Sequence, residues 1–170
     1  MAVTYKLIQT QTLGSSVATV TFSAIPQTYT DLLLLVSGRS DRASVVDDVK
    51  ITINGVTTNM TQRSIAANGA SVTSASDTAI YGSMNGNNAT STAFGLAEFY
   101  FVNYTSSTNA KSVSIEGISE TNGTTAYIYL NAALWNPGTQ AAITTLACTS
   151  YNAANFLTNS VFSLYGIKNS

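Results

Sequence analysis

Two glutamates are the residues with the clearest capacity for chemistry in this sequence. Glu98 lies in the strand-like segment Phe94 to Tyr104, and Glu116 lies in the next such segment, Lys111 to Ser119. Aligning the inward apolar residues of these two segments places both carboxylates on one outer face, opposite each other. Two carboxylates flanking a sugar bond are what glycoside hydrolysis requires.

A structural interpretation of the glutamate pair competes with the catalytic one, and we favour it. Exposed strand residues are commonly charged, and like charges directly opposite each other destabilise a strand pair. An arginine from a neighbouring subunit would relieve that repulsion. The candidate arginines are Arg39, Arg42 and Arg63.

Other reactive side chains give weaker signals. Asp41, Asp47 and Asp48 lie near one loop, but a calcium site needs six or more oxygens and no EF-hand-like spacing is present, so we expect no metal or other cofactor. Cys148 is the only cysteine, in a strand-like segment that favours a buried thiol. The chain has no histidine, which excludes Ser-His and Cys-His catalysis and leaves only lysine or carboxylate bases. We therefore expect that the protein is not an enzyme.

An aromatic stripe marks the strand-like segment Ala126 to Trp135. Tyr127, Tyr129 and Trp135 share one face, and the aliphatic residues between them share the other. Outward aromatic rings stack on sugars or anchor protein interfaces, whereas inward rings would mean a strand buried on both faces. A core or interface role is favoured over a sugar platform.

Composition favours an all-β chain that binds neither nucleic acid nor a membrane. Charged residues are 9% of the sequence, the net charge is −1, and Ser, Thr and Asn supply 61 of the 170 residues. The last three suit strand faces and turns, whereas helix-forming charged residues are scarce. Without a basic run we expect no nucleic-acid partner, and without a long apolar segment we expect no membrane partner.

The stretch Ile25 to Asp41 organises the remaining strands. It contains the longest aliphatic run, Leu32 to Val36, which predicts a central strand buried on both faces, followed by a loop with Arg39 and Arg42. Asn54-Gly55 after an alternating segment predicts a hairpin with Val56 to Met60 returning beside it. The weak pattern over residues 61–92 predicts long loops with one or two edge strands.

About eight principal strands therefore follow one another along the chain. This pattern predicts one domain over residues 1–170, an antiparallel sandwich of two sheets with a jelly-roll-like topology.

Three segments carry a resemblance to a known group of proteins. They are Ile25 to Asp41, the strand Phe94 to Tyr104 with its continuation NYTSSTNAKSVSIEGISE, and the ending SLYGIKNS. Together they resemble small virion structural proteins of tailed bacteriophages, of the decoration, cement or fibre type. The resemblance implies jelly-roll-like domains, commonly trimers, that contact the major capsid protein or other virion proteins, and a virion location after synthesis in the bacterial cytoplasm. It carries over no site residue.

The expected function is a capsid decoration or cement protein that binds across capsomers. The alternative is a tail-fibre or receptor-binding module that contacts glycans, and a third, weaker hypothesis is a glycoside-cleaving enzyme that uses the two glutamates. The candidate interface residues are Arg39, Arg42, Glu98, Glu116, Tyr127, Tyr129 and Trp135.

Overall fold

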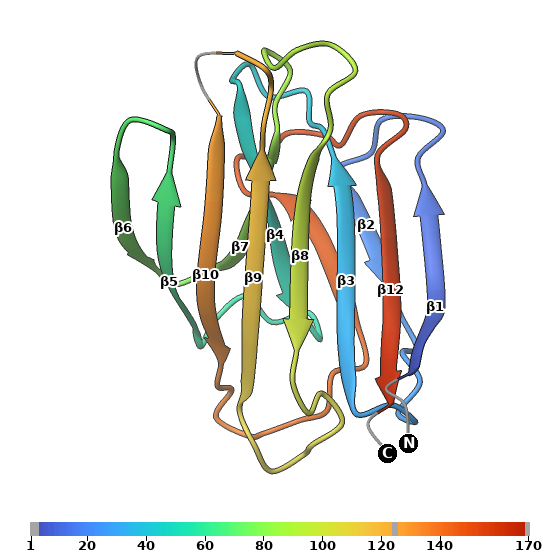
Figure 1. Ribbon diagram of the computed structural model, residues 1–170. Coiled ribbons are helices and arrows are strands. Elements are labelled where there is room, and N and C mark those ends of the chain that lie inside the picture. Colours follow the sequence, from blue (N-terminus) through green and yellow to red (C-terminus); the bar gives the residue numbers. More distant parts are fainter. Residues whose placement is uncertain (1–3, 124–125, 169–170) are drawn as a thin grey trace.

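Two antiparallel sheets packed face to face make up the fold (Figure 1). The computed structural model describes residues 4–123 and 126–168. The large sheet has eight strands, in the order β1 (Thr4–Thr12), β12 (Val161–Lys168), β3 (Asp31–Gly38), β8 (Gly95–Phe101), β9 (Lys111–Ser119), β10 (Tyr127–Trp135), β5 (Met60–Ala67) and β6 (Val72–Asp77). The small sheet has four, in the order β2 (Thr19–Phe22), β11 (Leu146–Ser150), β4 (Val46–Ile53) and β7 (Ile80–Asn85). The predicted all-β sandwich is confirmed.

The strand order is that of a jelly roll with an added hairpin. Eight strands form the sheets β2-β11-β4-β7 and β3-β8-β5-β6 once β1, β12 and the β9–β10 hairpin are set aside. The hairpin lies between β8 and β5, and it pushes β5 and β6 beyond the edge of the small sheet (Figure 1). The β9–β10 hairpin corresponds to two segments expected as strands, Lys111 to Ser119 and Ala126 to Trp135. The strands beyond the eight principal ones expected are mainly β5, β6 and β7, which stand where loops were expected.

The core lies between the inner faces of the two sheets. Leu32, Leu34 and Val36 of β3 are fully buried there, as are Ile51 and Ile53 of β4. Strand β7 lies so close to β9 that a Cβ on Gly117 would come within 2.7 Å of the Ser83 backbone nitrogen. A glycine is therefore required at that contact.

The free edge of β7 is capped by side chains of the large sheet. Tyr81 N donates to Gln62 Oε1 at 3.0 Å, and Asn131 Nδ2 donates to Tyr81 O at 2.9 Å. These two amide groups from β5 and β10 replace the backbone partners that another strand would supply. The edge of the small sheet is thereby closed to further pairing at Tyr81.

Strand β3 is apolar on both faces, as predicted, but the chain covers only one of them. On the inner face, every leucine and valine packs into the core. On the outer face, Leu33 is 8% exposed because Tyr165 of β12 and Tyr100 of β8 flank it in register, and Leu35 is half-buried. The central position in the large sheet is confirmed, and burial of the second face is only partial.

The predicted hairpin at Asn54-Gly55 is correct as a turn and wrong as a strand pair. Both residues have positive φ, 51° and 75°. Val56 makes only an isolated bridge to Ile53, and the chain then crosses to the large sheet, where β5 pairs with β10. The Asn54 side chain ties the turn to another segment instead, donating to Ala142 O at 2.7 Å and accepting from Thr144 N at 2.9 Å.

Residues 61–92 are more regular than predicted. This stretch contains most of β5, all of β6 and all of β7, followed by a loop from residue 86 to residue 93. Strand β6 carries Ser and Ala in place of alternating apolar residues because both of its faces are exposed.

Candidate functional site

The two glutamates lie directly opposite each other on the outer face of the large sheet. Glu98 of β8 pairs with Glu116 of β9 in register, as predicted. Partial burial, and then the neighbouring Glu116 charge, raise the pKa of Glu98 above its ordinary value. The pair is flanked in register by Leu35 on one side and Leu130 on the other. The carboxylates thus lie among aliphatic side chains on an open sheet face.

Arg39 is not available to a neighbouring subunit, contrary to its place among the predicted interface residues. Its side chain is 7% exposed, and the guanidinium donates to the carbonyls of Asn87 and Ala89 at 2.8 and 2.9 Å and of Thr90 and Ala93 at 2.6 and 3.1 Å. It holds the 86–93 loop in place. A buried guanidinium with this many acceptors serves the fold.

Arg42 is half-exposed and is engaged within its own loop. Its Nη1 donates to Val46 O at 2.9 Å and lies 3.8 Å from Asp47 Oδ1. Asp47 is fully buried and also accepts from Ser150 Oγ at 2.7 Å and from Asn152 Nδ2 at 2.8 Å. Arg42 therefore neutralises a buried carboxylate of the same chain and is not free to meet Glu98 or Glu116.

Arg63 is the remaining arginine, and it lies on the same outer face as the glutamate pair. It is exposed on β5, opposite Ala132 of β10, and its Nη1 donates to Gln62 O at 3.0 Å. Within the described residues, the one ion pair shorter than 4.0 Å is that of Arg42 with Asp47. Arg63 thus has no carboxylate partner in that part of the chain.

The aromatic stripe of β10 faces inward, one of the two orientations considered, so Trp135 is not available as the interface residue it was expected to be. Trp135 is 1% exposed and belongs to the core, and Tyr127 and Tyr129 are half-buried on the same face with ring centroids 5.8 Å apart. Burial raises the pKa of Tyr129 to about 12. Of the roles considered for these rings, the core role holds for Trp135.

The opposite face of β10 carries exposed aliphatic side chains that were not singled out from the sequence. We call the exposed residues of this surface the outer patch: Ile65 (54%), Val72 (71%), Leu96 (41%), Ile118 (40%), Ile128 (58%) and Leu130 (55%). Leu96, Ile118 and Ile128 are register neighbours across β8, β9 and β10, and Leu130 and Ile65 continue the surface on the next row. The signal that could have revealed it is the alternation of β10, which is apolar at both sets of positions.

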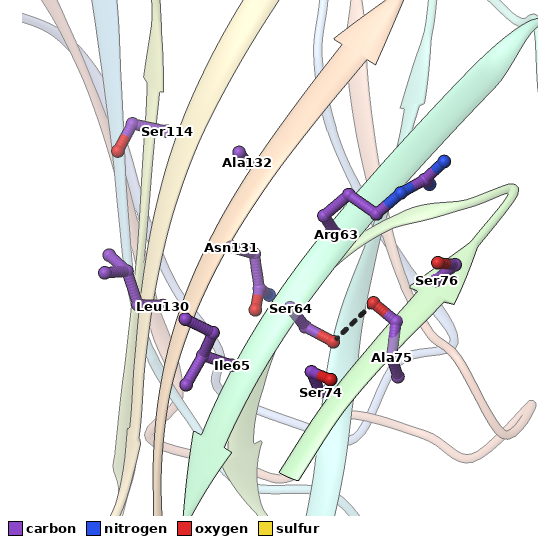
Figure 2. A pocket seen from close by; sticks show the side chains of 10 residues that line it. All are labelled: Arg63, Ser64, Ile65, Ser74, Ala75, Ser76, Ser114, Leu130, Asn131 and Ala132. Carbon is purple, nitrogen blue, oxygen red and sulfur yellow. Dashed lines mark hydrogen bonds between the residues drawn. The ribbon is translucent and has the colours of Figure 1, made fainter. Parts of the chain in front are cut away.

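A shallow groove of about 570 Å³ lies at one end of the outer patch. It runs over β9, β10, β5 and β6 and is bordered by Ile65 and Leu130, with the Arg63 side chain extending away from them (Figure 2). The groove gives the surface a recess that an aliphatic side chain could fill, next to a guanidinium that has no carboxylate partner among the described residues.

A second cluster, of polar and aromatic side chains, lies on the small sheet beside β10. Burial, then the charge of Asp47, raise the pKa of Asp48 to about 7, against the opposing effect of Arg42. Asp48 Oδ1 and Ser83 Oγ are both buried, have no hydrogen-bond partner among the described residues, and belong to register neighbours on β4 and β7.

Two tyrosines stand beside Asp48. Tyr81 and Tyr151 make an edge-on ring contact at 4.9 Å, and Tyr151 OH donates to Asp77 Oδ2 at 3.0 Å. Tyr151 is 40% exposed. Rings and carboxylates are thus combined on this side of the molecule, at a place where the sequence pattern did not predict them.

The remaining candidate residues do not form a reactive centre. Asp41 accepts from Asn155 N and Nδ2, both at 2.8 Å, so its carboxylate holds a loop. Cys148 is fully buried, which raises the pKa of its thiol to about 12. In residues 4–123 and 126–168, no group of three or more His, Cys, Asp or Glu side chains could hold a metal ion.

Comparisons with known proteins add no relative. No family model, curated protein or solved structure matches the chain. The described part of the chain has no helix with the length and apolar character needed to cross a membrane.

Proposed function

We propose that this protein is a structural component of a phage virion, a capsid decoration or cement protein that works through protein contacts. The observation that carries the proposal is the outer patch together with its opposed carboxylates, a surface that the chain itself leaves uncovered. Monomeric proteins rarely expose continuous apolar patches larger than a few hundred Å². A surface of this kind belongs to a protein that is covered in an assembly.

Several features favour assembly over catalysis. The glutamate pair lies on an open sheet face between Leu35 and Leu130, a setting that does not enclose a substrate. The thiol is buried, and the arginines other than Arg63 are used within the chain. A cement protein needs only shape, apolar contact and bonds that must break before the shell can open.

Purified phage particles provide the test. We expect the protein to be present in proportion to the major capsid protein, as measured by quantitative mass spectrometry. We also expect particles stripped of it to lose their DNA at a lower temperature, and re-addition of the purified protein to restore the original temperature. A few copies per particle, or unchanged thermal stability after stripping, would contradict the decoration role.

The Asp48 region supports a second candidate, a receptor-binding module of a tail fibre. Tyrosine rings beside carboxylates are a common way to hold a sugar, and Tyr151 is both exposed and bonded to Asp77. A glycan array with wild type and Tyr151→Ala distinguishes the candidates. Binding that the variant loses would favour the fibre module, whereas no binding by wild type would leave the decoration role as the better one.

A further inference from the structure

We infer that a second copy of this chain covers the outer patch, with the two copies related by a two-fold axis along β10 so that Arg63 of each faces Glu116 and Glu98 of the other. The inference rests on the proposed function for the premise that this face is a contact surface, and it names the partner. It follows from the positions of the charged residues on either side of β10.

The register of the large sheet places these residues on a regular grid. Leu130 of β10 lies between Glu116 of β9 and Ile65 of β5 on one row, and Ala132 lies between Ser114 and Arg63 on the next. Side chains two residues apart on a strand share a face and are separated by about 7 Å. The acidic pair therefore lies on one side of β10 and the arginine on the other.

A two-fold rotation about β10 exchanges these two sides. It lays β5 of one copy over β9 of the other, so Arg63 lies over Ser114, one row from Glu116. A guanidinium on a side chain of that length spans the row, and two such contacts occur in each dimer because an isologous interface repeats every contact. Leu130 meets its own copy at the axis, and the groove beside it accepts a partner side chain.

Charge complementarity argues for a second copy over an unrelated protein. Among the described residues, Arg63 has no carboxylate partner and the Glu98–Glu116 pair has no cation. Each copy offers the charge that the other lacks, on opposite sides of β10. The patch is thus complementary to itself in both its apolar centre and its charged margins.

The size of the surface reaches the lower limit for a specific contact. Adjacent strands are about 4.8 Å apart, so the rows over β8, β9, β10, β5 and β6 cover roughly 20 by 25 Å. Two such faces bury on the order of 1,000 Å², the lower limit for a specific interface. The uncovered outer side of Leu35 lies on the same row as Glu98 and extends this area.

Analytical ultracentrifugation of the full chain tests the inference. We expect wild type to sediment as a dimer of twice 17.8 kDa. Arg63→Glu and Glu116→Arg should each weaken self-association by about tenfold or more, because each places like charges face to face.

An equimolar mixture of the two variants should recover the dimer. In the mixed dimer, the carboxylate introduced at position 63 meets the guanidinium introduced at position 116, and the wild-type pair forms at the other contact. Lys6→Glu, an exposed charge change on β1, is the matched control and should leave the dimer intact.

A second measurement does not depend on charge. Leu130→Cys should be joined to its copy by a bis-maleimide cross-linker that spans about 10 Å, the spacing of two packed sheets, since the two Leu130 positions meet at the axis, whereas Lys6→Cys should not. Circular dichroism and thermal melting verify that each variant is folded. A monomeric or trimeric wild type, a mixture that stays monomeric, or a Leu130→Cys that fails to cross-link would overturn the inference. None of these results bears on copy number or capsid stability, so failure of the dimer and failure of the decoration role are distinguishable.

Discussion

The two faces of β10 are both rich in apolar side chains, yet one is core and the other is surface. Ala133 and Trp135 on the inner face are buried, whereas Ile128 and Leu130 on the outer face are more than half exposed. A strand that is apolar on both faces is typical of a sheet covered on both sides. The contrast shows that this chain covers the inner face of β10 and leaves its outer face exposed.

Arg39, at the end of β3, and Arg63, beside β10, repeat the contrast in polar terms. Arg39 is buried and its guanidinium is saturated by carbonyls of the 86–93 loop. Arg63 lies on the outer face with one backbone bond. Burying a guanidinium is costly unless its donors are satisfied, so the first arginine serves the monomer and the second is available for an assembly.

Truncating one large apolar residue on each face of β10 should give the largest difference in the free energy of unfolding. Trp135→Ala should lower the free energy of unfolding by about 3–5 kcal/mol because it removes a fully buried ring from the core. Leu130→Ala should change it by less than about 1 kcal/mol, because its side chain is already exposed in the monomer. Urea denaturation at a protein concentration low enough to keep the chain monomeric measures both. Equal losses would mean that the outer face is packed within one chain.

Replacing the buried Arg39 should also cost more unfolding free energy than replacing the exposed Arg63, with a smaller difference between the two variants. Arg39→Met leaves four loop carbonyls without their donor and should cost about 2–4 kcal/mol in the same assay. Arg63→Met should stay within about 0.5 kcal/mol of wild type. If loss of Arg39 left stability unchanged while the 86–93 loop kept its protease resistance, the clamp role would be wrong.

The smallest effect is expected from the two acids with raised pKa. Burial raises the pKa of Asp48 to about 7, so the folded state binds its proton more tightly than the unfolded chain does. Stability from this group is complete below the ordinary carboxylate pKa and is lost as the pH rises toward 7. Asp48→Asn should therefore gain roughly 1–3 kcal/mol over wild type at pH 8 and little at pH 4.

Glu98→Gln is the matched variant on the outer face. The pKa of Glu98 is raised for the same first reason, burial, but the group is more exposed, so its gain at pH 8 should be smaller than that of Asp48→Asn. Thermal melting between pH 4 and pH 8 compares the two. Suppose that the melting temperature of wild type rises over this range and does not differ from that of Asp48→Asn. That result would contradict the raised pKa of Asp48.

Alternation along the sequence predicted most of the strands and one important pairing. The inward alignment of Phe99 with Ile115 places Glu98 opposite Glu116, and the structure has that register. Leu32 to Val36 lies near the middle of the large sheet because no other segment is as apolar. These features were predictable because burial of one face fixes the register of a strand.

The features that the sequence did not predict depend on contacts between distant segments. The Asn54-Gly55 turn fixes its own backbone but does not determine in which sheet the next strand lies. The orientation of β10 could not be read from a strand with apolar residues on both faces, and Asn131, a polar residue, is buried there because it bonds to Tyr81 O. Strand β6 has no apolar alternation because neither of its faces is covered.

The β9–β10 hairpin also has a consequence for how the chain folds. Strands β8, β9 and β10 are consecutive in sequence and adjacent in the sheet, whereas β1 with β12 and β2 with β11 join segments more than a hundred residues apart. Local pairs close short loops and form early, and distant pairs form late. The three-stranded meander should therefore be the first ordered unit. The part of the outer patch that lies on these three strands, and that we infer joins two copies, would then already be exposed on each chain while most of its own sandwich is still incomplete.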